Sequence, residues 1–309
     1  MEVIEKEKYE HSIEVLKFGA EMSEQYYGKP LLLSYSGGKD SDTLLQLALE
    51  SGIKFEVQNS HTTVDAPETV YHIREVFKRL NEQGINAYIH HARYKDGRLI
   101  TMWNLIEKKK YPPTRIVRYC CDYLKEQSTP NRFIALGVRE EESAKRRGRN
   151  DFSTRSKSYE NRVYRDLKTA KRGKEIAEDL DEDSPNICVF IKSAMENKDL
   201  ICNPIYYWTE DDVWNFLKDR GVKTNPLYEK GFRRVGCIGC PLATKRERER
   251  GFLMYPKYKT NYIRAFERMD KTNYRGGILR NASGQDIFDW WMQDPRFYGQ
   301  EELEGWRDE

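Results

Sequence analysis

Hydrophobic residues along the first part of the chain follow two periods, one helical and one extended. Tyr9, Ile13, Leu16 and Ala20 are spaced as on one face of a helix, which predicts a helix within residues 1–27. Further on, short apolar runs that favour buried strands alternate with segments of helical period. The predicted strands are 31–35, 54–58, 86–90 and 132–137, and the predicted helices between them are 43–49 and 67–80.

The alternation of strands and helices predicts an α/β fold with an open, mostly parallel twisted sheet and helices on both faces. Beyond about residue 150 the pattern becomes irregular. It recovers at the segment TEDD, 209–212, which predicts a capping box and a helix through Leu217. Because no internal repeat and no clean linker interrupt the chain, the pattern favours one domain over 1–309, with a charged insertion at about 145–200 and a helical C-terminal part.

Composition and charge favour a folded protein with a broad charged surface, since 38% of the residues are hydrophobic and 33% are charged. No apolar run approaches the ~18–20 residues that span a bilayer, and the N-terminus lacks the apolar stretch of a signal peptide, so we expect a cytoplasmic protein without a membrane partner. Residues 145–174 carry twelve Lys or Arg against three Asp or Glu. This segment is either a solvated insertion or a surface that faces the phosphates of a nucleotide or nucleic acid. The alternating charges at 245–250 predict an exposed, salt-bridged helix.

The segment SGGKDS, 36–41, follows the first predicted strand and opens a helix. Two glycines allow a tight turn whose N–H groups form an anion-binding nest, and the N-terminus of the following helix also favours phosphate. The serine hydroxyls and the lysine add further donors. The plainer alternative is an ordinary glycine turn between a strand and a helix, in which Asp40 or Ser41 caps the helix.

This segment resembles the PP-loop of the adenine-nucleotide α-hydrolases, which cleave ATP between its α and β phosphates, and the spacing of a Walker A loop is absent. The segments HTTVDAPET, 61–69, and GVREEES, 137–143, are similar to elements near the nucleotide in the phosphoadenosine phosphosulfate (PAPS) and adenosine phosphosulfate (APS) reductase family. All three follow predicted strands, where ligands gather on open α/β sheets. The nucleotide-binding residues that the resemblance implies are Ser36, Gly37, Gly38, Lys39, Asp40, Ser41, Thr63, Asp65, Gly137, Arg139 and Ser143.

Catalysis in such a loop would be chiefly electrostatic. The loop N–H groups, Lys39, Arg139 and Mg²⁺ would stabilise the charge on the departing pyrophosphate. The expected catalytic residues are therefore Lys39, Asp40 and Arg139. Either Asp40 or Asp65 would hold Mg²⁺, and the alternative for both carboxylates is local capping.

Four of the six cysteines form two close pairs, Cys120-Cys121 and Cys237-x-x-Cys240. Four thiolates in two pairs can hold tetrahedral zinc or a [4Fe–4S] cluster. In a zinc ribbon each half normally supplies a C-x-x-C pair, so the tandem Cys-Cys does not suit one. Its arrangement resembles that of the cluster-bearing sulfonucleotide reductases, which also carry a lysine at the position of Lys125. The resemblance therefore favours a [4Fe–4S] cluster over zinc, held by all four cysteines.

The chain departs from these reductases at their nucleophilic cysteine, which lies in a C-terminal tail. No cysteine follows Cys240 here, and Cys188 and Cys202, each expected to be a small buried hydrophobic residue, lie in no matching context. The sequence therefore favours an ATP pyrophosphatase, producing AMP and pyrophosphate, that activates a target for sulfur transfer.

In this respect the chain resembles the DndC-type proteins of bacterial DNA phosphorothioation and phage relatives of the reductases. The resemblance implies that such proteins use ATP to activate a target for sulfur insertion. Beside ATP, the implied partners are a nucleic acid acceptor and a sulfur-donor protein such as a cysteine desulfurase. One alternative is a sulfonucleotide (APS/PAPS) reductase. The other is a non-catalytic nucleotide-sensing or DNA-binding regulator that keeps the loop and the cluster as structure.

Overall fold

The computed structural model describes residues 6–129, 131–142, 151–155, 199–271 and 281–293. By its internal contacts the chain divides into two compact units. The first consists of Met1–Ser60, Pro67–His90 and Gln127–Val235, and the second of His61–Ala66, His91–Glu126 and Gly236–Glu309. The predicted charged insertion lies almost wholly outside the described residues. It stays a prediction, as does the single domain.

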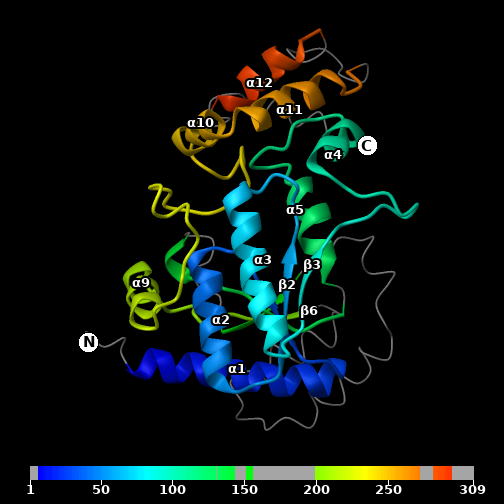
Figure 1. Ribbon diagram of the computed structural model, residues 1–309. Coiled ribbons are helices and arrows are strands. Elements are labelled where there is room, and N and C mark those ends of the chain that lie inside the picture. The colour runs from blue at the N-terminus through cyan, green and yellow to red at the C-terminus, as the bar shows by residue number, and fades with distance from the viewer. Residues whose placement is uncertain (1–5, 130, 143–150, 156–198, 272–280, 294–309) are drawn as a thin grey trace. The chain divides into compact units, whose positions relative to one another are not determined.

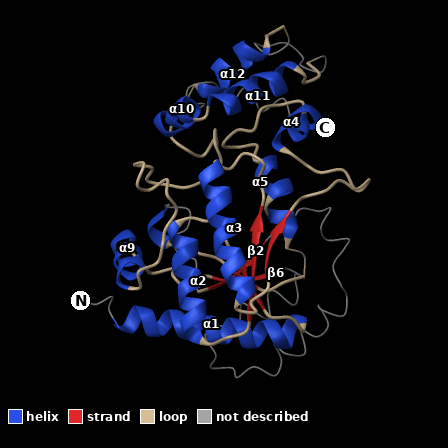
Figure 2. Ribbon diagram, viewed as in Figure 1, coloured by secondary structure: helices blue, strands red, loops and turns tan. Residues whose placement is uncertain are grey.

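In its described part the first unit contains strands and helices, which can be followed in Figures 1 and 2. The helices are α1 (Lys6–Tyr27), α2 (Lys39–Ser51), α3 (Pro67–Glu82) and α9 (Glu210–Asp219). The strands are β1 (Leu31–Ser34), β2 (Phe55–Ser60), β3 (Ala87–His90), β4 (Ile134–Ala135), β5 (Phe152–Arg155) and β6 (Asp199–Cys202). Short 3₁₀ turns in the described residues are η1 (Glu126–Ser128), which spans one of the points where the chain passes from one unit to the other, and η2 (Glu140–Glu142).

In the part of the chain that the structure describes, six strands form one sheet in the order β3-β2-β1-β4-β6-β5. Neighbouring strands are parallel except for β5 and β6. Leu33 of β1 pairs with Val57 on one side and Ala135 on the other. The predicted open, mostly parallel α/β sheet is therefore confirmed. The sequence pattern missed β5 and β6 because strands of four residues, set in or beside an irregular stretch, show too little periodicity.

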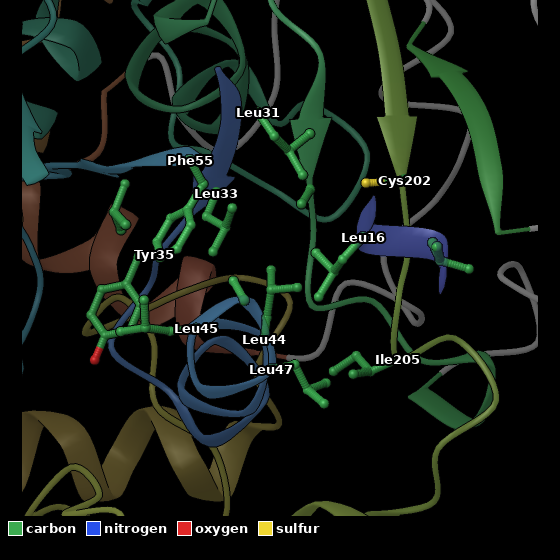
Figure 3. Close-up of a cluster of buried hydrophobic side chains, with 14 of the residues drawn as sticks. Leu16, Leu31, Leu33, Tyr35, Leu44, Leu45, Leu47, Phe55, Cys202 and Ile205 are labelled. Atoms are coloured by element: carbon green, nitrogen blue, oxygen red, sulfur yellow. The ribbon is translucent and has the colours of Figure 1, made fainter. Parts of the chain in front are cut away.

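The centre of the sheet is fully covered. Residues 31–33 of β1 are at most 1% exposed, as expected for a parallel strand with packing on both faces. Leu16 of α1 and Leu44 and Leu47 of α2 belong to the same buried cluster (Figure 3). Cys202 lies there too with no exposed surface, which confirms it as a small buried hydrophobic residue.

Helix α2 begins earlier than its hydrophobic pattern predicts. It starts at Lys39 rather than at residue 43, because Gly38 is extended (φ −105°, ψ 163°) and the chain turns into the helix directly after it. The first turn is polar, so an analysis of apolar spacing does not detect it. Asp40 and Asp42 in that turn suit the positive end of the helix dipole.

The capping box predicted for α9 is confirmed. Thr209 Oγ1 accepts a hydrogen bond from the Asp212 N–H at 3.1 Å, and the helix begins at Glu210. Three helices of the second unit start with the same device, in which a hydroxyl caps the third helical residue; the capping residues are Thr101, Thr244 and Ser283.

The second unit is helical in its described part. Its helices are α4 (Met102–Lys109), α5 (Tyr119–Leu124), α10 (Lys245–Met254), α11 (Pro256–Glu267) and α12 (Gly284–Met292). The last three confirm the predicted helical C-terminal part. Exposed Lys245 and Glu249 approach to 3.9 Å on α10, which confirms the salt-bridged helix. Among the described helices of the whole chain, none has both the length and the apolar character needed to cross a membrane.

A buried hydroxyl bonds helix α1 to the segment before α9 in the same unit. Ser12, which has no exposed surface, donates to the carbonyl oxygen of Pro204 at 2.7 Å. It also accepts a hydrogen bond from the indole N–H of Trp208 at 2.9 Å. Trp208 is itself 2% exposed, so its N–H has no access to water.

We predict that Ser12→Ala lowers the free energy of unfolding by about 1–3 kcal/mol, because it leaves the buried Trp208 N–H and Pro204 carbonyl without this partner. Urea denaturation of the whole chain measures the loss. The matched control is Ser51→Ala at the end of α2, whose hydroxyl bonds only its own helix, to the carbonyl of Ala48. Equal stability of the two variants would contradict the prediction.

Candidate functional site

The loop at 36–41 turns the chain from β1 into α2. The turn requires glycine at position 37, because any other residue there would be strained. Gly37 has φ +73°, in the left-handed region. A β-carbon there would lie 2.9 Å from the side chain of Ile73 on α3. The loop therefore depends on Gly37 both for its backbone angle and for its packing.

The serines of the loop bond to each other and to its backbone. Ser41 Oγ accepts from the Gly38 N–H at 3.1 Å and donates to the Gly38 carbonyl at 2.8 Å. Ser36 Oγ donates to Ser41 Oγ at 3.3 Å. The predicted residues are thus brought together, but the Gly38 N–H of the expected anion nest is bonded to a hydroxyl of the protein.

Two residues far along the chain hold the loop from outside, and sequence reasoning did not single out either. The hydroxyl of Tyr228 accepts a hydrogen bond from the Lys39 N–H at 2.8 Å. The side chain of Asn225 donates to the Gly37 carbonyl at 2.9 Å. Pro226, which lies between them in the sequence, is a residue typical of loops and turns and does not mark a site.

The predicted catalytic residues form one connected ion-pair network in the first unit. Lys39 Nζ lies 3.1 Å from Asp40 and 3.8 Å from Glu210 at the start of α9. The guanidinium of Arg139 lies 2.6 Å from Asp40 and 2.9 Å from Glu141. Both cationic residues are buried, with Lys39 6% and Arg139 3% exposed, so their charges are held in fixed positions.

Within this network two positive charges, from Lys39 and Arg139, meet three negative charges, from Asp40, Glu141 and Glu210, giving a formal sum of −1. A polyphosphate is also anionic and would be repelled unless a further cation accompanied it. Carboxylate oxygens are ligands that Mg²⁺ prefers, and it commonly takes one or two of them together with phosphate. The residues present therefore fit Mg²⁺.

Behind the loop lies a buried polar group of three side chains. Tyr35, the residue before the loop, donates to Asp42 of α2 at 2.5 Å, and its hydroxyl lies 3.2 Å from His72 Nε2 of α3. Burial first, and then the Asp42 carboxylate, raises the pKa of Tyr35 well above its usual value. The hydroxyl therefore stays protonated and ties the end of β1 to α2.

The second cysteine pair lies in a tight turn of the second unit. Gly239 between the two cysteines has φ +74°, and a β-carbon on it would lie 2.6 Å from Phe252. Tyr262 donates its hydroxyl to the Ile238 carbonyl at 3.0 Å, which fixes the backbone of the turn. The ring of Trp291 lies 4.8 Å from that of Tyr262 and closes the aromatic packing around Gly239.

The segment 61–66 runs along this turn. Asp65 pairs with Cys237 in an antiparallel bridge, and the Ile238 N–H donates to the Val64 carbonyl at 2.8 Å. The thiol of Cys237 donates to Thr62 Oγ1 at 3.4 Å and lies 3.8 Å from a carboxylate oxygen of Asp65. One cysteine of the CxxC pair is thereby held by the segment that the sequence expects near the nucleotide.

The tandem cysteines lie on the short helix α5. A hydrogen bond between their side chains raises the pKa of Cys120 and lowers that of Cys121 to about 6. The charges of the Cys237 and Cys240 thiolates also raise the pKa of Cys120. The same anionic groups, Cys237 most of all, raise the pKa of Lys125.

None of these four cysteines is in a disulfide, and the donor set is purely of sulfur. Sulfur ligands of this kind suit zinc or an iron–sulfur cluster, so the residues fit the predicted cluster in kind. In the described ranges, no three or more His, Cys, Asp or Glu side chains are arranged to hold a single metal ion.

The remaining predicted residues fall in three places. Gly137 lies in the first unit against the loop, and its β-carbon would come within 2.8 Å of the Asp40 carbonyl. Thr63 and Asp65 belong to the second unit, with the cysteines, so their nucleotide contacts stay predictions. Ser143 and Cys188 lie outside the described residues.

A sequence model of the phosphoadenosine phosphosulfate reductase domain matches residues 30–243, which include the loop, Arg139 and all four paired cysteines. The chain belongs to the phosphoadenosine phosphosulfate reductase family. It is an enzyme of the PP-loop type, and the family resemblance that the loop, the segment after β2 and the segment after β4 predict is confirmed.

Curated relatives are similar to this chain over only part of their length. An uncharacterized protein of Methanocaldococcus jannaschii is 25% identical over 231 residues, which is 74% of this chain and 40% of that protein. The adenosine 5′-phosphosulfate reductase of Oceanobacillus iheyensis is 37% identical over 51 residues, 16% of this chain and 21% of that enzyme. The chain spans less than half the length of these relatives.

Solved structures are similar at a greater distance. The U34-tRNA thiolase NcsA of Methanococcus maripaludis, with its [4Fe–4S] cluster, has a TM-score of 0.42 and 15% identity over 93% of this chain and 79% of its own. The PAPS reductase of Candida auris has a TM-score of 0.43 and 12% identity over 76% of this chain and 96% of its own. Likenesses this distant say nothing about the chemistry of this member of the family.

We predict that Gly239→Ala lowers the free energy of unfolding by at least about 2 kcal/mol, since it combines a strained left-handed backbone with overpacking against Phe252. Thermal unfolding measures the loss. Gly236→Ala is the matched control, because a β-carbon there meets nothing within 4 Å and the backbone angle is not left-handed. A melting temperature for Gly239→Ala as high as that of the control would show that the turn is not packed as described.

Proposed function

We propose that this family member is an ATP pyrophosphatase that activates a target for sulfur transfer and carries a [4Fe–4S] cluster. Membership of the family supports nucleotide-binding, sulfur-related chemistry. The observation that carries the finer proposal is the network in which buried Lys39 and Arg139 meet at Asp40, beside the serines of the loop. Two fixed cations at the N-terminus of a helix suit a phosphate chain that gains charge as it leaves.

In the proposed reaction an oxygen of the acceptor attacks the α-phosphorus of ATP. The bond from that phosphorus to the bridging oxygen breaks, and pyrophosphate leaves with the electron pair. A sulfur donor then displaces AMP from the adenylated acceptor. Lys39 and Arg139 would stabilise the charge on the pyrophosphate, Ser36 and Ser41 would orient its oxygens, and Asp40 would hold both cations in place and contribute a ligand to Mg²⁺.

Mg²⁺, when bound, would supply the positive charge that the network lacks. Cys120, Cys121, Cys237 and Cys240 would hold the cluster, which supplies one-electron redox capacity. For the acceptor we propose a nucleic acid, supported by the basic composition of residues 145–174, with a cysteine desulfurase or similar protein as sulfur donor.

A sulfonucleotide reductase is the second candidate, because a segment of the chain is 37% identical to an adenosine 5′-phosphosulfate reductase. The two functions separate in one assay. Anaerobically purified protein given ATP, with water attacking in place of the acceptor oxygen, would release AMP and pyrophosphate under the first proposal. With APS or PAPS and a thiol donor it would release sulfite under the second.

We predict that Ser36→Ala and Lys39→Ala each lower the rate of pyrophosphate release by about 10²–10³-fold, because each removes a donor to the departing charge. Iron content should stay at the level of the unmodified protein, since neither residue lies in the unit that contains the four paired cysteines. Lys54→Ala, at an exposed position before β2, is the matched control and should keep full activity. Normal turnover in both loop variants would refute the site.

We also predict that Cys120→Ser and Cys240→Ser lose most of the bound iron, about four atoms per chain in the intact protein. Iron, zinc and acid-labile sulfide are measured after anaerobic purification. Cys202→Ala is the control, because Cys202 lies in the core of the first unit and should keep its iron. Zinc in place of iron, or unchanged iron in the two serine variants, would exclude the cluster on these ligands.

A further inference from the structure

Tyr228 lies at the point where the proposed site would contact phosphate. Its hydroxyl oxygen accepts the hydrogen bond of the Lys39 N–H at 2.8 Å, the first amide of α2. Unbonded N–H groups at the start of a helix are the groups that bind phosphate in such loops. The tyrosine oxygen therefore occupies the position in which a phosphate oxygen would accept from this amide.

The tyrosine is anchored rather than free to swing away. The N–H of Tyr228 donates to the Asn225 carbonyl at 3.1 Å, and the side chain of Asn225 bonds the Gly37 carbonyl at 2.9 Å and Thr69 Oγ1 at 3.1 Å. Asn225 is completely buried. The ring of Trp214 on α9 packs edge-on against the tyrosine ring at 4.9 Å. Loop and tyrosine are thus held by the same buried residue, the loop through its side chain and the tyrosine through its backbone carbonyl.

A hydroxyl that accepts from an amide still has its own proton to donate. Within the described residues the Lys39 N–H is the partner recorded for the hydroxyl of Tyr228. Burial first, and then the carboxylates of Asp40, Asp42 and Glu210, raise the pKa of this tyrosine above its usual value. The hydroxyl therefore keeps its proton and can donate it.

We propose that Tyr228 is a nucleotide-binding residue of this site, which accepts from the Lys39 N–H and donates its O–H to a phosphate oxygen of ATP. The Lys39 N–H would then not contact the phosphate itself. It would donate to the Tyr228 hydroxyl, and the hydroxyl would donate to the phosphate. This inference rests on the proposed nucleotide substrate but not on the pyrophosphatase reaction.

The test is the binding of ATP with Mg²⁺, and of inorganic pyrophosphate, to the full chain and to Tyr228→Phe, by titration calorimetry. Loss of one hydrogen bond to an anion is expected to weaken both affinities about tenfold or more. Tyr9→Phe is the matched control. Its hydroxyl donates to Glu50 at 2.8 Å, away from the loop, and its removal should leave both affinities unchanged. Melting temperatures of the two variants check that both are folded.

Unchanged affinity in Tyr228→Phe would overturn the inference. Tighter binding would also overturn it, and would identify the hydroxyl as a competitor that phosphate must displace. An unmodified chain that binds neither ligand would overturn it as well. Pyrophosphate release is measured separately: an unmodified chain that binds ATP but releases none would refute the proposed reaction while the role of Tyr228 stands.

Discussion

The backbone at Gly137 lies against the first turn of α2 with no room for a side chain between them. A β-carbon at this position would come within 2.8 Å of the Asp40 carbonyl and 3.3 Å of the Ser41 nitrogen. This close approach follows from the sheet, in which β4 runs parallel to β1 and both chains leave at the same edge. Because the approach is so close, Arg139, two residues on, reaches Asp40 from a position 99 residues away. The part of the ion-pair network that Arg139 supplies depends on this one close approach of backbone to backbone.

The charges so assembled are already paired. Each of the two buried cations has two carboxylate neighbours, which holds its position and offsets the cost of burying it. The same pairing means that the loop is no simple positive pocket. A phosphate chain gains access to Lys39 and Arg139 only if a cation enters with it or the carboxylates move. In the proposed site the network would thus link nucleotide binding to an accompanying cation by charge balance, independently of which reaction follows.

In the second unit, packing of aromatic rings rather than pairing of charges fixes the predicted site residues. Its CxxC turn is fixed by aromatic rings that leave space for glycine alone at position 239, and by the pairing of Asp65 with Cys237. Apolar packing therefore sets the position of the CxxC turn, as it commonly does where a site must be held rigidly. The loop network and the cysteine pairs each form within one unit, so each can be altered by mutation without removing residues of the other.

Local sequence determined the elements whose signals are short-range. Apolar periods marked α1, α3 and the four strands β1 to β4, the segment SGGKDS marked the turn that opens α2 although not the first residue of the helix, and cysteine spacing marked the two cysteine pairs. Each of these depends on residues only a few positions apart, where backbone preference and side-chain pattern act directly. The tertiary structure alone decided the rest. Tyr228 and Asn225 reach the loop across nearly two hundred residues, and nothing in their local pattern marks them as different from other loop residues. Their role arises because packing brings separate segments to one point, and that is a property of the folded chain.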